Sequence, residues 1–318
     1  KFCSSAVSPT AAIADTTRAR GDARRSFSRA EGADMDSFNK AIQDPEKLKA
    51  TALRYMKTEA FKVWASFLAV VIAIYFLFSS GDFSFLLTLS SVVSVFSFLM
   101  VVVKIESNRS VRGVSLKMME CYILILTCRL FAIVPFEGYL PFDKSGDWLY
   151  QLCEAIGLGL AGTIVYFCRS RFQSTYDPES DTLNHLYLIV PALAISFVFH
   201  PNLNSFLPSD IAWAFALYLE SVAVLCQLFM FMKEGQAQPH TSHFLAAQAV
   251  AKLLTFIFWA SSFSELSNPN HYIKSFVGKW VVVMQLVQLL VMGDFIYHYI
   301  RCIRKGIPVS QVLCSDNV

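Results

Sequence analysis

Long apolar runs without a single charge are the feature that most constrains this chain. Residues 63–81 contain no charged side chain, and neither do residues 83–103. Each run can cross the hydrocarbon core of a bilayer, which takes about 20 residues of helix. Six further apolar stretches are candidate spans: 119–136, 148–168, 184–200, 211–232, 244–264 and 276–300. The sequence therefore predicts an all-α polytopic membrane protein with eight transmembrane helices.

The composition argues against several classes of soluble protein. Of the 318 residues, 55% are hydrophobic and 16% are charged, and the mean hydropathy is +0.47. Soluble domains carry about 25% charged residues. The net charge of +3 is too small to indicate a nucleic-acid partner. The sequence carries no phosphate-binding glycine loop, metal-binding histidine pair or spaced nucleophile–base set, so we expect no enzyme and no cofactor.

The first 60 residues differ from all that follow. Residues 1–60 are rich in Ala, Ser, Asp and Arg and have no apolar periodicity, which predicts a disordered cytosolic tail. An organelle-targeting peptide is the alternative, and the acids Glu31, Asp34 and Asp36 argue against it. The chain starts at Lys1, and Met35 is a second candidate for the natural start.

The distribution of Lys and Arg predicts the orientation in the membrane. Basic residues concentrate in the loops after the second, fourth, sixth and eighth predicted helices, which the positive-inside rule assigns to the cytosol. The intervening loops, 137–147, 201–210 and 265–275, hold few basic residues and are expected to face a lumen. Both termini, including a C-terminal tail at 307–318, are then cytosolic.

Five charged residues interrupt the predicted helices: Arg129, Glu154, Glu220, Lys252 and Asp294. A charge facing lipid costs a few kcal/mol or more, so we expect all five to face the interior. A rise of about 1.5 Å per residue places Arg129, Glu220 and Lys252 at similar depth and Asp294 nearer the cytosol. Two interpretations remain open. The charges either lock helices together as ion pairs or line a cavity in which the cations meet a ligand carboxylate.

Two tryptophans favour the cavity. Trp213 and Trp259 lie within predicted spans, where an indole N–H needs a hydrogen-bond acceptor. A tryptophan near the end of a span is more often an interfacial anchor, a role that suits Trp148 better than Trp259.

One segment is specific to a known family. Residues 218–229, Tyr-Leu-Glu-Ser-Val-Ala-Val-Leu-Cys-Gln-Leu-Phe, resemble the Y-L-E-S-V-A-x-L-P-Q-L-F signature of the ER lumen protein-retaining (KDEL/HDEL) receptors. Shorter matches keep the family's order: 110–115, 126–129, 174–177, 181–182, 242–243 and 293–297. The resemblance covers roughly 83–306. The extra helix at 61–80 is similar to that of the longer receptor-like branch of the family.

The resemblance implies a fold and a function. The fold is a seven-helix bundle of two three-helix repeats and a linker helix, similar to PQ-loop and sugar-porter proteins. The function is binding of the C-terminal tetrapeptide of escaped ER residents in the mildly acidic Golgi, followed by retrieval in COPI vesicles and release at neutral pH. The implied location is the ER and cis-Golgi membrane, and the implied partners are the tetrapeptide, the COPI coat and the lipid bilayer, without nucleic acid.

The resemblance also assigns roles to residues of this chain. The implied ligand-binding residues are Arg129, Asp210, Trp213, Glu220, Lys252 and Trp259. Asp210 stands for a family Glu, and Lys252 replaces an Arg without its bidentate fork. Asp294, Arg304 and Lys305 are implied in retrieval, although basic residues there also suit positive-inside anchoring. The candidate pH sensors are His200 and Glu220.

Several ligand contacts of the family are replaced in this chain. The family's N-terminal Arg falls at Leu87 and its first-helix His at Ser94. Further family contacts fall at Leu130, Ala132, Ala251, Phe258 and Ser262. Loss of two arginines reduces the complementarity to an acidic peptide, so a different C-terminal signal or weaker binding is expected. Two other functions remain open: a small-solute transporter with a neutral polar pathway, and a membrane adaptor whose interior charges are self-paired.

Overall fold

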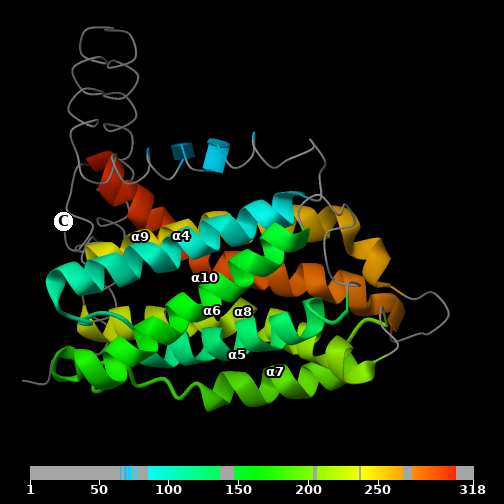
Figure 1. The fold of residues 1–318 in the computed structure, drawn as a ribbon, viewed down its shortest axis with the longest axis horizontal. Helices are drawn as coiled ribbons and strands as arrows, with labels where there is room; N and C mark the ends of the chain where they lie inside the picture. The colour runs from blue at the N-terminus through cyan, green and yellow to red at the C-terminus, as the bar shows by residue number, and fades with distance from the viewer. Residues whose placement is uncertain are drawn as a thin grey trace, which may run out of the picture. The chain divides into compact units, whose positions relative to one another are not determined.

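The computed structural model describes residues 85–136, 147–202, 206–235, 238–267 and 274–305, together with isolated positions between 65 and 76 (Figure 1). The chain divides into two compact units, Lys1–Ser66 and Phe67–Val318, and every helix below belongs to the second. The predicted tails at 1–60 and 307–318 lie outside the described residues, as does most of the helix predicted at 61–80.

Seven α-helices lie in the described ranges, and each corresponds to one predicted span. Their bounds are α4 (Phe85–Asn108), α5 (Leu116–Ile133), α6 (Asp147–Tyr166), α7 (Leu186–Val198), α8 (Leu207–Glu234), α9 (Pro239–Ser262) and α10 (Val277–Lys305). Short helical turns follow or precede them: η3 (Phe167–Arg171), η4 (Gln173–Thr175), η5 (Phe263–Leu266) and η6 (Lys274–Phe276). The prediction of an all-α fold is confirmed for the part of the chain that the structure describes.

Five of these helices are long and apolar enough to cross a membrane. They are α4, α6 with its π-helical extension to Arg171, α8, α9 from His240 and α10 with its preceding turn. The other two differ for physical reasons. α7 has 13 residues, which span about 20 Å, and it contains Pro191. α5 carries Lys117, Glu120 and Arg129, so its apolar character is interrupted. The prediction of a multi-span membrane protein is confirmed.

Local sequence signals explain where α5 and α8 begin or end. The Ser115 side chain accepts a hydrogen bond from the backbone N–H of Met118 and so caps α5. Gly113 precedes this cap with φ +79°, and a Cβ there would collide with the Gln238 side chain. Gly235 ends α8 in the left-handed conformation that glycine adopts at low cost.

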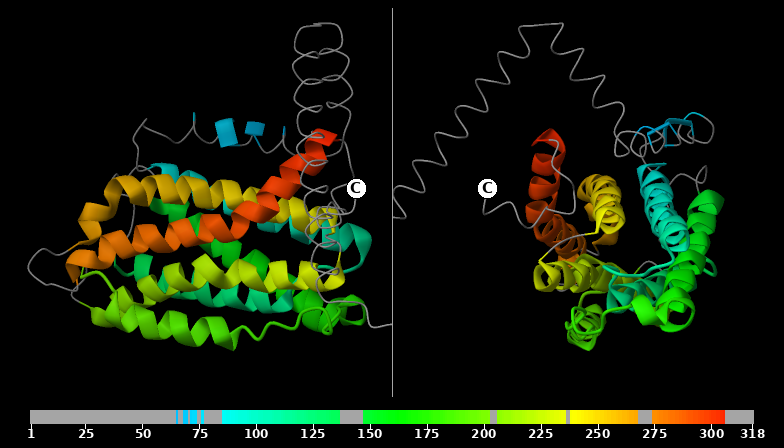
Figure 2. Two further views of the ribbon diagram at one scale, coloured as in Figure 1. Left: turned by 180° about the vertical axis from the view of Figure 1, so that it is seen from behind. Right: turned by 90° about the vertical axis from the view of Figure 1, so that its left-hand side faces the viewer.

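The helices pack in a pattern that relates the first three to the last three. α6 packs against both α4 and α5, and α10 packs against both α8 and α9. Between the two sets, α4 packs against α9 and α5 packs against α8, whereas α7 packs against α8 at the edge of the bundle (Figures 1 and 2). Among these six helices, the contacts are unchanged when α4, α5 and α6 are exchanged with α8, α9 and α10, respectively.

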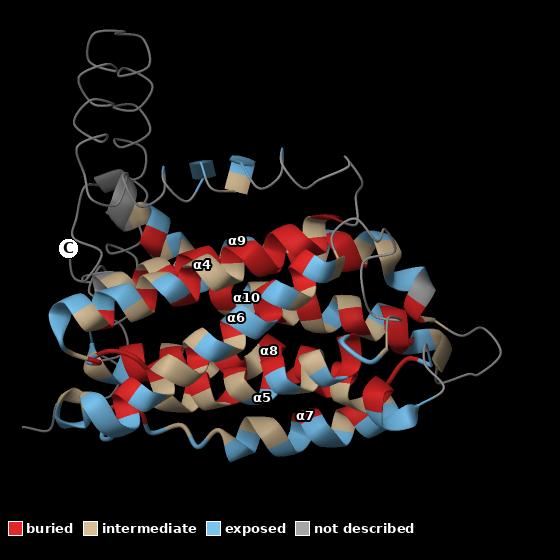
Figure 3. Ribbon diagram, in the orientation of Figure 1, coloured by how far each residue is buried: buried red, intermediate tan, exposed pale blue. Residues whose placement is uncertain are grey.

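Burial follows from this packing. α8 contacts α5, α7 and α10, and most of its residues are buried, whereas α7 exposes most of its apolar side chains (Figure 3). Tyr218 and Leu219 of α8 are fully buried, and Tyr187 and Phe197 of α7 are exposed. Exposed apolar side chains of this kind suit contact with lipid. Val71, one of the isolated described positions, packs against a core cluster formed by α4 and α6.

Candidate ligand-binding site

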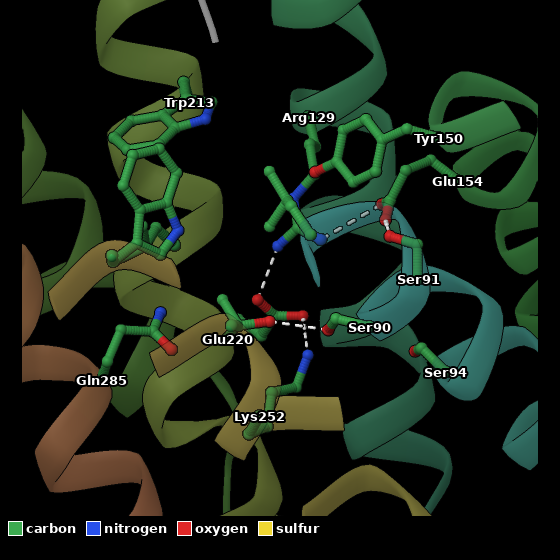
Figure 4. Close-up of a pocket in the computed structure, with 14 residues that line it drawn as sticks. Ser90, Ser91, Ser94, Arg129, Tyr150, Glu154, Trp213, Glu220, Lys252 and Gln285 are labelled. Carbon is green, nitrogen blue, oxygen red and sulfur yellow. Dashed lines mark hydrogen bonds and ion pairs between the residues drawn. The ribbon is translucent and has the colours of Figure 1, made fainter. Parts of the chain in front are cut away.

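A cavity with a volume of about 30 Å³ lies among α4, α5, α6, α8, α9 and α10. It is lined by Leu87, Ser90, Ser91, Ser94, Arg129, Tyr150, Glu154, Trp213, Leu217, Glu220, Lys252, Thr255, Trp259 and Gln285 (Figure 4). All of these residues lie in the half of their helix that is nearer the loops predicted to be lumenal. The packing of six helices, rather than one motif, therefore forms the cavity.

Arg129, which lies on α5, forms ion pairs with two acids on other helices. Its Nη1 lies 3.1 Å from Glu154 Oε2 on α6, and its Nη2 lies 2.6 Å from Glu220 Oε2 on α8. The Arg129 side chain is only 13% exposed, so these contacts form largely away from water. The two ion pairs connect three helices through one guanidinium group.

Lys252 uses the second oxygen of the same carboxylate. Its Nζ, on α9, lies 2.6 Å from Glu220 Oε1. Each Glu220 oxygen therefore holds a different cation, as Figure 4 shows. The two cations belong to one cavity and share one acid.

Neutral groups complete the network. Ser91 Oγ donates to Glu154 Oε1 at 2.6 Å, and Gln288 Nε2 donates to the Glu220 carbonyl oxygen at 2.9 Å. Ser90 Oγ donates to the Ala251 carbonyl oxygen at 2.8 Å. These contacts fix the positions of both acids and of the α9 backbone next to Lys252. Two acids face two cations, so the network has no net formal charge, and none of the four is buried without an opposite charge.

The two predicted tryptophans form one wall of the cavity. The Trp213 and Trp259 rings meet edge to face, with centroids 5.3 Å apart, and Phe258 packs against Trp259 in the same manner. Both indoles are buried within the bundle, so they are not interfacial anchors. They give the cavity an apolar surface beside its charged centre.

The structure brings most of the predicted ligand-binding residues together. Arg129, Trp213, Glu220, Lys252 and Trp259 all line the cavity. Asp210 is buried in the first turn of α8 but is not among the lining residues. Whether any of these residues binds a ligand stays a prediction.

The pH-sensor candidates lie in different places. Glu220 is at the centre of the cavity, whereas His200 follows α7, is buried and does not line the cavity. His200 Nδ1 lies 3.0 Å from the Pro201 carbonyl oxygen. The neighbouring Phe199 carbonyl oxygen accepts from the Tyr218 hydroxyl of α8 at 2.5 Å, which places His200 close to the helix that carries Glu220.

The expectation that all five interior charges face inward is wrong for Asp294. Its side chain on α10 is 86% exposed, and its Oδ1 lies 3.7 Å from His298 Nε2. Asp294 is seven residues from Arg301, so it is close enough to the helix end for water or headgroups to reach it. α10 continues through Arg304 and Lys305, whose side chains lie outside the described residues.

Several lining residues were not predicted as site residues. Glu154 was recognised as an interior charge, but only the structure shows it next to Arg129. Gln285 is a polar residue in the apolar run of α10, a signal that could have identified it. Leu87 and Ser94, the positions at which the sequence resemblance implies an Arg and a His, both line the cavity.

A second polar cluster, outside the cavity, joins four of the sequence motifs. Asp181 accepts from Ser115 Oγ at 2.9 Å and from the Tyr176 hydroxyl at 2.8 Å, and Lys117 Nζ donates to its carbonyl oxygen. Burial, and then the nearby Asp181 carboxylate, raise the pKa of Tyr176 above its usual range, so the hydroxyl remains a donor. Gln227 on α8 accepts from Ser115 N at 2.9 Å. The cluster fastens the start of α5 to the loop before α7 and to α8.

Comparison with known proteins identifies the family. A model of the ER lumen protein retaining receptor family matches residues 110–262. The zebrafish (Danio rerio) ER lumen protein-retaining receptor 2 is 32% identical over 213 residues, which cover 67% of this chain and 91% of that protein. The chain belongs to the ER lumen protein-retaining receptor family. The human (Homo sapiens) receptor 2 is 33% identical over 208 residues, covering 65% of this chain and 89% of the relative.

Membership agrees with the resemblance that the sequence motifs indicated. The family is one of multi-pass membrane receptors and is not enzymatic, as the sequence predicted. The family match includes Arg129, Glu154, Glu220 and Lys252, so the charged centre of the cavity lies within it. α4 and α10 lie outside the 110–262 match and supply the remaining cavity walls.

Proposed function

We propose that this protein is a receptor that binds the C-terminal retention signal of ER-resident proteins and retrieves them to the ER. The observation that carries the proposal is the shared carboxylate of Glu220, which holds Arg129 and Lys252 in one cavity. A peptide carboxylate has the charge and shape of the Glu220 and Glu154 side chains. It therefore competes with these acids for the two cations.

Glu154 and Glu220 stabilise the ligand-free receptor by pairing with its buried cations. A buried cation without an opposite charge is costly, and here each cation already has a partner. Ligand binding then exchanges one carboxylate for another instead of leaving a charge unpaired. The two indoles supply apolar surface for the side chains of the peptide.

The same arrangement argues against Glu220 as the source of acid-dependent binding. Arg129 and Lys252 both stabilise the ionised carboxylate, so Glu220 keeps its charge in a mildly acidic compartment. His200 is the remaining candidate sensor, because histidine is the side chain whose charge ordinarily changes near neutral pH and because it adjoins the contact between Phe199 and Tyr218 on α8.

The proposed setting is the ER and cis-Golgi membrane, with both termini in the cytosol and the cavity on the lumenal side. The lining residues lie near the loops with few basic residues, which supports this orientation. The exchangeable packing pattern of α4–α6 and α8–α10 supports two three-helix repeats linked by α7. Asp294, Arg304 and Lys305 lie at the opposite end of α10, where they would recruit the COPI coat.

Direct binding tests the proposal. A labelled tetrapeptide-ended peptide is titrated onto the purified protein at acidic and neutral pH. We expect tighter binding at acidic pH and its loss in Arg129→Ala. The matched control is Arg169→Ala, because Arg169 is an exposed arginine that pairs with Glu120 away from the cavity. Failure of the wild-type protein to bind at any pH, or equal binding by Arg129→Ala, would refute the receptor function.

A membrane adaptor is the second candidate, and the closed pairing of Arg129 and Lys252 favours it. In an adaptor the ion pairs only hold the helices together. Replacement of Glu220 by Gln and Lys252 by Met in one variant would then leave cellular function intact. The receptor proposal expects retrieval to be lost in this variant.

A further inference from the structure

The side chain of Gln285 lines the cavity from α10 without a hydrogen-bond partner among the described residues. Gln285 is 1% exposed, and neither its Nε2 nor its Oε1 makes a hydrogen bond. Figure 4 shows its carboxamide on the side of the cavity near Glu220, with no dashed line reaching it. Buried amides in folded proteins are normally hydrogen-bonded, so this group requires an explanation.

Other polar groups of the cavity already have partners. Ser91 donates to Glu154, Ser90 donates to the Ala251 carbonyl oxygen, and Ser94 accepts from Gln248. One turn further along α10, Gln288 donates to the Glu220 carbonyl oxygen. Gln288 therefore has a structural contact. The Gln285 amide is directed at the cavity instead, and both its N–H donors and its carbonyl acceptor are available to a ligand.

The chemistry of the group indicates what it binds. A carboxamide offers one acceptor and a donor pair and carries no charge. A carboxylate only accepts and an ammonium only donates, and the cavity already has charged partners for both. An amide matches a carboxamide at both ends, because it also offers one N–H donor side and one C=O acceptor. In a peptide ligand that group is the main chain.

We propose that Gln285 is a specificity-determining residue that hydrogen-bonds a main-chain amide of the bound peptide. The inference rests on the proposed receptor function and adds to it a hydrogen bond between the receptor and the peptide backbone. Gln285 thereby distinguishes a peptide C-terminus from other small carboxylates, which lack an amide at that place.

Replacement of Gln285 should have opposite effects on the stability of the empty protein and on its affinity for peptide. Gln285→Leu removes a buried polar group without a partner, so it raises the unfolding temperature of the empty protein. The same change removes the contact with the ligand, so it weakens peptide binding. A residue with only a structural role would not move stability and affinity in opposite directions.

Ester-containing peptides test the contact directly. Each main-chain amide of the tetrapeptide is replaced in turn by an ester, which removes the N–H donor. We expect one ester to weaken binding to the wild-type protein by roughly three- to tenfold, as does Gln285→Leu with the natural peptide. The same ester should cause no further loss of peptide affinity in Gln285→Leu. Gln285→Met is the substitute if the Leu variant is not recovered.

Gln288→Leu is the matched control. It removes the structural contact with the Glu220 carbonyl oxygen, so we expect a lower unfolding temperature and an unchanged response to every ester. Wild-type affinity in Gln285→Leu, or full ester sensitivity in that variant, would overturn the assignment and leave the receptor function standing. Absence of peptide binding by the wild-type protein would instead overturn the receptor function itself.

Discussion

Lys252 Nζ on α9 lies 2.6 Å from Glu220 Oε1 on α8, and this buried ion pair joins two consecutive helices at the centre of the cavity. The other Glu220 oxygen bonds Arg129 of α5, which also pairs with Glu154 of α6. Substitution of any of the four therefore changes the partners of the others.

Loss of the shared carboxylate should destabilise the protein. Glu220→Gln leaves Lys252 buried without an acid, so we expect a loss of about 3–5 kcal/mol in the free energy of unfolding. Adding Lys252→Met removes the stranded cation and should recover part of the loss. Chemical unfolding in detergent measures both. The control is Glu106→Gln, a partly exposed ion-pair partner, with an expected loss of about 1 kcal/mol or less. A double variant as unstable as Glu220→Gln would contradict the pairing.

Removal of the second acid should strengthen ligand binding. Glu154→Gln leaves Arg129 with only one competing carboxylate, and a neutral amide is the weaker acceptor. We expect the affinity for a peptide with a free C-terminal carboxylate to rise roughly three- to tenfold. A peptide with an amidated C-terminus serves as the control and should gain nothing. Weaker binding of the free-acid peptide would show that Glu154 does not compete with the ligand.

The pH dependence of binding should come from His200 and not from Glu220. Arg129 and Lys252 keep the Glu220 carboxylate ionised, whereas histidine is the side chain whose charge ordinarily changes between about pH 5 and pH 8. We expect the wild-type affinity for peptide to fall as the pH rises through this range and His200→Gln to bind with the same affinity throughout. Isothermal titration at several pH values checks the slope. An unchanged slope in His200→Gln would exclude His200 as the sensor.

The polar cluster around Asp181 should support folding and not ligand binding. Asp181→Asn weakens the contacts with Ser115 and Tyr176, so we expect a loss of about 1–3 kcal/mol in the free energy of unfolding. The folded variant should bind peptide with wild-type affinity. Asp177→Asn is the control: the Ser180 hydrogen bond lowers the pKa of the partly exposed Asp177, and the loss of this bond should cost less stability. A large affinity change in Asp181→Asn would indicate coupling between the cluster and the cavity.

Asp294 should affect retrieval without affecting binding. Its carboxylate is 86% exposed on α10 and is not among the cavity-lining residues. We expect Asp294→Asn to change the free energy of unfolding by less than about 0.5 kcal/mol and to leave peptide affinity unchanged. In cells the variant should accumulate in the Golgi, as measured by its distribution relative to a cargo protein. Normal return to the ER would remove Asp294 from the proposed retrieval machinery.

The sequence predicted the helices well because apolar runs of membrane length have few structural alternatives. Each helix from α4 to α10 corresponds to a predicted span, and α7 forms despite Pro191. The inward orientation of Arg129, Glu220 and Lys252 also followed from the cost of placing charge in lipid. The same argument failed for Asp294, because its nearness to the helix end gives it access to a polar environment.

By itself, then, the sequence determined the fold class, the family and which residues bear charge inside the bundle, because these depend on local composition and on motifs along one chain. Only the tertiary structure decided the partners. Glu220 pairs with cations on two other helices, and Glu154 pairs with the second terminal nitrogen of Arg129. Gln285 lines the cavity from α10. Depth along a helix follows from residue number, whereas rotation about its axis and the choice of neighbours depend on how six helices pack together.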